Sequence, residues 1–247
     1  MVRAPADGVA MLVLMAVLGT AAAGWAVALA WRSRDLVPIL VCAGAAIAVL
    51  NEPIYDLLGQ IAYPSNHLRL FTAFGRDIPV FLVFGYLPWM GLLALYVARL
   101  MERGAPARTV RIIAAASFAS VVVIEAIGTG TDNWVYRGEA PLKYLGVAPQ
   151  LAPSPIVCGF AVFVLARHLR GWSRLWYLAV PGVSLGAVFA GSSWPMYLAL
   201  NSDAATVVDW LAGAATLALC AGIVWGVTGL AADLATAEAT GRTRDDR

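Results

Sequence analysis

Long apolar stretches separated by short polar connections dominate the pattern of this chain. A helix needs about 20 mostly apolar residues to cross a bilayer, and the pattern predicts seven such helices. The expected ranges are 8–31, 36–58, 78–100, 110–130, 153–170, 174–199 and 206–232. The first stretch is too long for a removed signal peptide and lacks a convincing cleavage site, so we expect it to be retained. The predicted fold is therefore an all-α, seven-helix transmembrane bundle over 1–235, with a polar cytoplasmic tail over 236–247.

Composition agrees with a membrane location and narrows the functional classes. Hydrophobic residues make up 61% of the chain and charged residues 13%, against about 25% charged in an average soluble domain. That balance excludes a soluble globular fold and a disordered chain. The net charge of +2, with no basic stripe interleaved with aromatic residues, gives no support to nucleic-acid binding. We expect a multi-pass protein of the cell membrane whose first partner is the lipid bilayer.

The arginines set the expected orientation. Most lie in the connections after the first, third and fifth predicted helices and in the tail, and fewer lie on the opposite side. Because basic residues concentrate in cytoplasmic connections, we expect the N-terminus outside and the C-terminus in the cytoplasm. The two long outer connections, roughly 61–79 and 131–155, then hold most of the polar and aromatic side chains. The second is rich in proline and glycine, which predicts an ordered cap or a re-entrant loop.

Carboxylates within the apolar stretches are the main functional signal. Such groups cost a few kcal/mol in hydrocarbon and mark function by default. Glu52 and Asp56 are four residues apart and share one helical face, and Pro53 between them should kink the helix and free a carbonyl. Glu125 lies near the outer end of the fourth helix and Asp209 one turn into the seventh. All four are predicted at the same depth, so we predict that they form one catalytic site.

Simpler interpretations exist for several acids. Asp77 and Asp132 fit helix N-caps or exposed loop positions, and Asp209 fits a first-turn acid that complements the helix dipole. Arg69 or Arg76 fits a structural counter-ion.

Aromatic residues occupy the same predicted depth as the acids. They fit the interfacial belt of a membrane protein, but they also fit the wall of an apolar pocket in which aromatic faces stabilise a cation. A protonated carboxylic acid beside an ionised one is a general acid/base pair. Together they predict cyclisation of a lipophilic small molecule through a cationic intermediate, with Glu52 as acid. The aromatic residues are Tyr55, Tyr63, Tyr86, Trp89, Trp134, Tyr136, Trp194 and Tyr197.

Cofactor chemistry has little support in the sequence. The cysteines form no CxxC pair, and His67 and His168 fall in connections predicted on opposite sides of the membrane, so we expect neither a metal site nor a disulfide framework. The single lysine, Lys143, lies in a polar connection, which excludes a retinal Schiff base within the last helix. We expect no cofactor.

One stretch resembles a known family. The sequence NEPIYDLLGQIAYPSN, followed by FTAFGRDIPVFLVFGY, resembles the AveC-like (spirocyclase) family of actinobacterial integral membrane proteins over roughly residues 50–90. The resemblance implies closure of a polyketide's dihydroxy ketone into a spiroketal through an oxocarbenium ion. It is carried by Glu52, Pro53, Asp56, Tyr63, Asn66, Gly75, Ile78 and Pro79. The resemblance assigns no catalytic residues, so the predicted site rests on position alone. The predicted substrate-binding residues are Tyr55, Tyr63, Asn66, Tyr86, Trp89, Trp134, Tyr136 and Trp194.

Two alternatives stay open. Small integral membrane terpene cyclases are similar in size and helix number and use an early glutamate and a late aspartate, which implies comparable roles for Glu52 and Asp209. A non-enzymatic transporter or accessory subunit is the third possibility, although the polar groups collect at one depth and do not run through the membrane. The sequence leaves the oligomeric state open.

Overall fold

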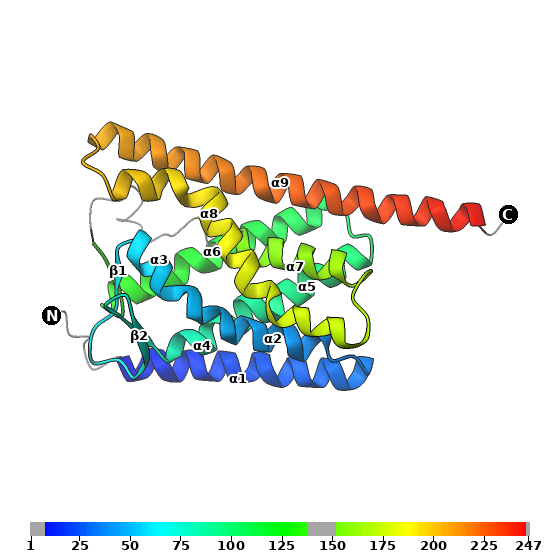
Figure 1. The fold of residues 1–247 in the computed structure, drawn as a ribbon, viewed down its shortest axis with the longest axis horizontal. Coiled ribbons are helices and arrows are strands. Elements are labelled where there is room, and N and C mark those ends of the chain that lie inside the picture. Colours follow the sequence, from blue (N-terminus) through cyan, green and yellow to red (C-terminus); the bar gives the residue numbers. More distant parts are fainter. Residues whose placement is uncertain (1–7, 138–151, 246–247) are drawn as a thin grey trace.

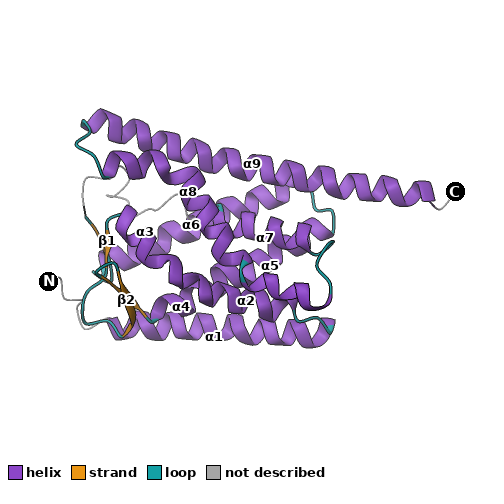
Figure 2. Cartoon of the chain, in the orientation of Figure 1, coloured by secondary structure: helices purple, strands orange, loops and turns teal. Residues whose placement is uncertain are grey.

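Helices that run roughly along one long axis form most of the molecule, and short strands gather at the end where α1 begins (Figures 1 and 2). The computed structural model describes residues 8–137 and 152–245, of which 238–245 are described as backbone alone. The helices are α1 (Gly8–Ser33), α2 (Val37–Ile47), α3 (Glu52–Leu58), α4 (Phe81–Tyr86), α5 (Ala94–Glu102), α6 (Ala107–Gly130), α7 (Ser154–Leu165), α8 (Val180–Leu200) and α9 (Thr206–Asp245).

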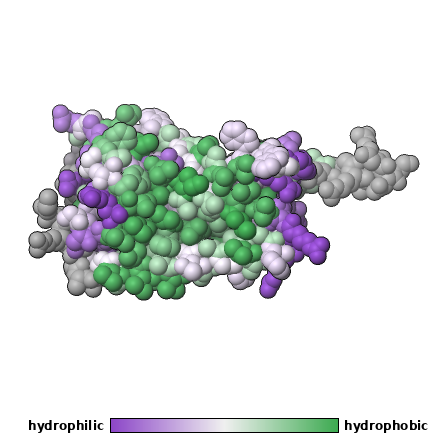
Figure 3. Space-filling view, turned by 60° about the horizontal axis from the view of Figure 1, so that its bottom comes forward, coloured by the Kyte–Doolittle hydropathy of each residue, from purple (hydrophilic) through white to green (hydrophobic). Residues whose placement is uncertain are grey.

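Six helical segments are long and apolar enough to cross a bilayer. A continuous apolar surface lies between two ends that carry polar side chains, as Figure 3 shows for one face. This indicates a polytopic helical membrane protein, as the sequence predicted. The six segments are Gly8–Ser33, Val37–Leu58, Phe81–Glu102, Ala107–Gly130, Val180–Leu200 and Thr206–Ala237.

The helix predicted over 153–170 is shorter than expected. α7 has 12 residues, and at 1.5 Å per residue it is about 18 Å long, less than the hydrocarbon thickness. It packs against α5 and α8, and Ile156, Cys158 and Phe163 are fully buried. A 3₁₀ helix over Gly171–Leu178 follows it. α7 is therefore a helix of the protein core. The predicted cap or re-entrant loop of the 4–5 connection falls partly on residues 138–151, which lie outside the described residues.

Two transmembrane segments change their helical geometry midway. Between α2 and α3 the chain makes a 3₁₀ turn over Ala48–Asn51, and Pro53 occupies the first turn of α3, where no backbone N–H is needed. The carbonyl of Val49 accepts from the N–H of Glu52. The expected break at Pro53 is thus present, but the carbonyl that we expected to be free is bonded.

The second change is a π-helical segment between α4 and α5. It covers Leu87–Leu93, and Pro88 lies in its first turn. Proline removes one hydrogen bond of the α-helical pattern, and a π-helical turn accommodates one extra residue at such a place. The segment widens the helix where it faces α1 and α2.

The two long connections contain short strands that the hydrophobic pattern did not indicate. β1 (Ile61–Ala62) pairs antiparallel with β4 (Val135–Tyr136) and joins the 2–3 connection to the 4–5 connection. β2 (Arg69–Ala73) and β3 (Arg76–Pro79) form a hairpin. The bundle therefore carries two small sheets at the end where α1 begins.

The β2–β3 hairpin explains Asp77. Phe74 and Gly75 both have positive φ, 52° and 70°, as a two-residue type I′ turn requires. Asp77 accepts hydrogen bonds from Thr72 at 2.5 Å and Arg69 at 3.4 Å. Asp77 is thus a hairpin residue and not a helix N-cap.

α9 continues as a helix to Asp245, past the expected boundary at 232. Toward the end of the bundle opposite the strands, α9 is bonded to α6 by Arg111, whose Nε donates to Thr228 at 2.9 Å. The guanidinium lies 3.4 Å from the ring centre of Trp225. The Arg111 guanidinium therefore interacts with an aromatic face and a hydroxyl group, and its aliphatic stem can cover apolar surface.

Gly19 sets the close approach of α1 to α4, and replacing it should separate them. A Cβ at Gly19 would lie 2.6 Å from the carbonyl oxygen of Phe84, whereas one at Gly24 on the same helix would meet nothing within 4 Å. We expect Gly19→Ala to lower the free energy of unfolding by about 1–3 kcal/mol and Gly24→Ala to leave it unchanged or raise it. Thermal unfolding in detergent micelles measures both, and equal behaviour of the two variants would contradict the packing.

Candidate functional site

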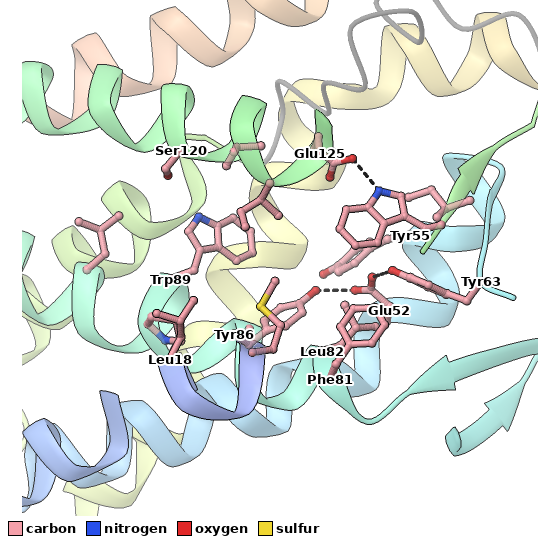
Figure 4. Close-up of a pocket in the computed structure, with 18 of the residues that line it drawn as sticks. Leu18, Glu52, Tyr55, Tyr63, Phe81, Leu82, Tyr86, Trp89, Ser120 and Glu125 are labelled. Carbon is pink, nitrogen blue, oxygen red and sulfur yellow. Dashed lines mark hydrogen bonds between the residues drawn. The ribbon is translucent and has the colours of Figure 1, made fainter. Parts of the chain in front are cut away.

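A cavity of about 330 Å³ lies close to the strand-bearing end of the bundle. Most of its wall is apolar or aromatic, and its polar side chains come from separate elements (Figure 4). Segments far apart in the chain thus contribute to one cavity. The wall consists of Met15, Leu18, Glu52, Tyr55, Ile61, Tyr63, Phe81, Leu82, Gly85, Tyr86, Pro88, Trp89, Leu93, Ser120, Val121, Ile124, Glu125, Trp134, Tyr136 and Phe189.

Glu52 is held between two tyrosines. It begins α3 directly after the 3₁₀ turn, and only 7% of its surface is exposed. Tyr63 donates to Oε1 at 2.7 Å and Tyr86 to Oε2 at 2.5 Å, as the dashed lines in Figure 4 show. Both carboxyl oxygens therefore have a hydroxyl partner although the group lies among apolar side chains, which offsets much of the cost of burying it.

Tyr63 reaches Glu52 because β1 leads the chain back over the cavity. Burial, reinforced by the nearby Glu52 carboxyl, raises the pKa of the Tyr63 hydroxyl well above its usual value. Tyr63 therefore keeps its proton at physiological pH and remains a hydrogen-bond donor.

Glu125 has a similar arrangement on α6. It is 7% exposed, and its Oε2 accepts from the indole of Trp134 at 2.9 Å and the hydroxyl of Tyr136 at 2.8 Å. Burial and the Glu125 carboxyl raise the pKa of Tyr136, so this hydroxyl also stays protonated. Oε1 has no hydrogen bond to any described residue. Glu125 thus presents one oxygen that a ligand can use.

Asp56 does not reach the cavity although it lies one turn from Glu52. It is fully buried, and neither oxygen has a hydrogen-bond partner among the described residues. α3 packs against β3, and Arg76 of β3 acts electrostatically on Asp56 while donating to the carbonyl of Ile61 at 3.1 Å. The structure therefore places Asp56 near β3 and outside the wall of the cavity.

Three other predicted residues also lie outside the wall. Asn66 is exposed in the 2–3 connection, and Trp194 on α8 is 53% exposed. Asp209 lies in the first turn of α9, which packs against α8, α6 and α7. The predicted residues that the cavity does bring together are Glu52, Glu125, Tyr55, Tyr63, Tyr86, Trp89, Trp134 and Tyr136.

Part of the wall went unnoticed in the sequence. Phe189 of α8 stacks on Tyr55 with ring centres 3.8 Å apart, and Phe81 of α4 lies 6.0 Å from Tyr63. Leu18 and Ser120 also line the cavity. Each is an ordinary residue of an apolar stretch, so no local signal separates it from residues that face lipid.

The arrangement suits proton transfer inside an apolar chamber. Two carboxyl groups, one bonded by two tyrosines and the other by a tryptophan and a tyrosine, face a space lined with aromatic side chains. This is a setting for general acid/base chemistry and for a transient cation. Among the described residues, no three His, Cys, Asp or Glu side chains gather as metal ligands. No protein-family model, curated protein or solved structure that was compared with the chain matches it.

The contact of Trp134 with Glu125 depends on Gly128. A Cβ at Gly128 would collide with the indole of Trp134, whereas one at Gly130 would meet nothing within 4 Å. We expect Gly128→Ala to move Trp134 away and to break its bond with Glu125, visible as a shifted indole N–H resonance in ¹⁵N-labelled protein. Gly130→Ala is the matched control for helix propensity. An unmoved resonance in Gly128→Ala would refute the contact.

His67 should make stability depend on pH. Its ring nitrogen Nε2 lies 2.9 Å from the carbonyl oxygen of Asn133, and its ring packs on Phe81. Burial lowers the pKa of His67 below 6.5, against the opposing effect of that carbonyl. As pH falls below about 6.5, the unfolded chain takes up the proton first, so the native state loses stability; above that pH the contribution is complete.

Urea or thermal unfolding between pH 5 and pH 7 tests this effect of His67. We expect His67→Gln, which keeps a donor for Asn133, to flatten the profile in that range. A variant with the same slope as the wild type would contradict the assignment.

Proposed function

We propose that this chain is a membrane-embedded enzyme that cyclises a lipophilic small molecule by acid catalysis. The observation that carries the proposal is the pair Glu52 and Glu125, which face one apolar cavity and are each held by aromatic donors. A buried carboxyl is costly in a membrane and is retained where it has a task.

Spiroketal formation is the reaction that we propose for this site. One hydroxyl of a dihydroxy ketone adds to the carbonyl carbon and gives a cyclic hemiketal. Protonated Glu52 then donates its proton to the hemiketal hydroxyl. The C–O bond to this hydroxyl breaks, which releases water and forms an oxocarbenium ion. The second hydroxyl attacks the cationic carbon, and its proton passes to Glu125. The released water can return that proton to Glu52, so the net reaction is loss of one water.

The walls would contribute to this reaction in two ways. The faces of Tyr55, Phe81 and Phe189 lie around the chamber and would stabilise a cation. An apolar space also excludes bulk water, which would otherwise compete with the second hydroxyl.

The substrate is expected to come from the bilayer. Leu18 of α1 lines the cavity and is also 43% exposed, and Ser120 of α6 lines it and is exposed. Both belong to apolar spanning helices, so the cavity borders the surface that lipid would cover. A lipophilic molecule would enter between α1 and α6 without crossing water.

A terpene cyclase is the second candidate, and aromatic walls are its supporting feature. That proposal assigned the late acid to Asp209, which does not line the cavity. Glu125 would have to replace it. A transporter has less support, because the buried carboxyls with donors gather at one end of the bundle.

We also propose the orientation of the bundle and a seventh crossing that includes α7. α1 begins at the strand-bearing end and α9 ends at the opposite end (Figure 1). That opposite end gathers the arginines, so it is the proposed cytoplasmic side and the cavity is near the outer side. The arginines are Arg32, Arg34, Arg99, Arg103, Arg108, Arg111, Arg167, Arg170 and Arg174.

Glu52→Gln should abolish cyclisation. The amide fills the same space but has no acidic proton, so we expect the rate to fall by about 10²–10⁴-fold. The assay supplies a synthetic long-chain dihydroxy ketone to membranes that contain the protein, and mass spectrometry follows loss of water against membranes without it. Glu102→Gln, an exposed acid at the other end of the third spanning segment, is the control. Full activity of Glu52→Gln would refute the assignment.

A further inference from the structure

Trp89 presents a buried donor that nothing in the described part of the protein satisfies. Its indole lines the cavity, and Nε1 is buried without a hydrogen-bond partner among the described residues. An unpaired buried donor costs about 1–3 kcal/mol, and the indole N–H of a buried tryptophan usually finds an acceptor. Because the indole lines the cavity, an acceptor on a molecule bound there would supply the missing partner.

The backbone around Trp89 independently marks the position. Trp89 lies in the π-helical segment Leu87–Leu93, and such segments are rare and occur frequently at functional sites. Three residues of this segment, Pro88, Trp89 and Leu93, line the cavity. The π-helical segment thus contributes three residues to the cavity wall while its other residues pack against α1 and α2.

Trp89 and Glu52 lie at different ends of the same cavity. Figure 4 shows Glu52 beside Tyr63 on one side and Trp89 on the other, with the indole nitrogen turned toward Ser120. Tyr86 connects them, since its hydroxyl bonds Glu52 and its ring packs edge-on against Trp89 at 5.6 Å. The chamber therefore has two polar ends separated by apolar wall.

The chemistry at the Trp89 end favours an oxygen atom. An indole N–H only donates, so its partner must be an acceptor. Ser120 donates its own proton to the carbonyl of Ser117 at 2.7 Å, which leaves Oγ of Ser120 to accept. A hydroxyl between them would accept from Trp89 and donate to Ser120, and an ether or ketone oxygen would satisfy Trp89 alone.

We propose that Trp89 is a specificity-determining residue that binds an oxygen substituent on the substrate's apolar chain, remote from the group that reacts at Glu52. The inference rests on the proposed function in that the cavity takes a lipophilic small molecule. It narrows the substrate class to oxygenated lipophiles, as polyketides are, because an unsubstituted isoprenoid hydrocarbon has no acceptor to offer.

The test uses matched probes and needs no turnover. The full chain in detergent micelles, with ¹⁵N-labelled tryptophan, is titrated with dodecan-2-one and with dodecane, which has no acceptor. Trp89→Phe identifies the Trp89 resonance by its loss and removes only the donor and part of the ring. Trp25→Phe is the control, since Trp25 is 63% exposed on α1 and does not line the cavity.

We expect the ketone, but not dodecane, to shift the Trp89 indole proton downfield. We expect Trp89→Phe to weaken ketone binding about fivefold, the effect of losing one neutral hydrogen bond, and to leave dodecane binding unchanged. Trp25→Phe should alter neither. An unmoved Trp89 resonance at saturating ketone, or equal weakening for both probes, would overturn the proposal.

Failure of this inference is distinguishable from failure of the proposed function. A Trp89 shift together with full cyclising activity in Glu52→Gln would sustain the donor assignment and refute the cyclase chemistry. An unmoved Trp89 resonance together with an inactive Glu52→Gln would refute the donor assignment and support the cyclase chemistry.

Discussion

The cost of placing a carboxyl group in hydrocarbon constrains the strand-bearing half of this protein. Glu52 and Glu125 are buried within spanning segments, so each needs donors. Tyr86 comes from a neighbouring helix, but Tyr63, Trp134 and Tyr136 come from the connections. The connections must therefore fold back over the bundle, and the β1–β4 pairing fixes them there. The β1–β4 sheet thus lies beside three of the four side chains that donate to the buried acids.

Departures from regular helix surround the cavity. The 3₁₀ turn before Glu52, the π-helical segment at Trp89 and the close approach at Gly128 all border it. Each costs some local stability, and such local conflicts concentrate where function requires them. Elsewhere the helices pack as an ordinary apolar core, with α7 enclosed within it. Irregular backbone is not confined to the cavity, however, because the 3₁₀ helix over Gly171–Leu178 contributes no residue to its wall.

The two polar ends of the cavity have different chemical characters. At one end Glu52 and Glu125 offer carboxyl groups, and at the other the indole of Trp89 offers a donor. Apolar and aromatic side chains fill the distance between them. A ligand that satisfies both ends must be lipophilic along its length and carry oxygen at separated positions. In the proposed reaction, recognition and proton transfer would therefore be carried by different residues.

The sequence by itself determined the membrane class, most of the helical spans and the acids worth attention. Each polar side chain in hydrocarbon carries its own transfer cost, so these features can be recognised residue by residue. The sequence also located Glu52 beside a helix break at Pro53. Only the tertiary structure decided which polar residues meet. Asp56 shares a helical face with Glu52 yet turns to β3, and Asp209 and Trp194 lie outside the cavity. Two-residue strands leave no periodic signal, and the facing of a side chain depends on how separate helices pack.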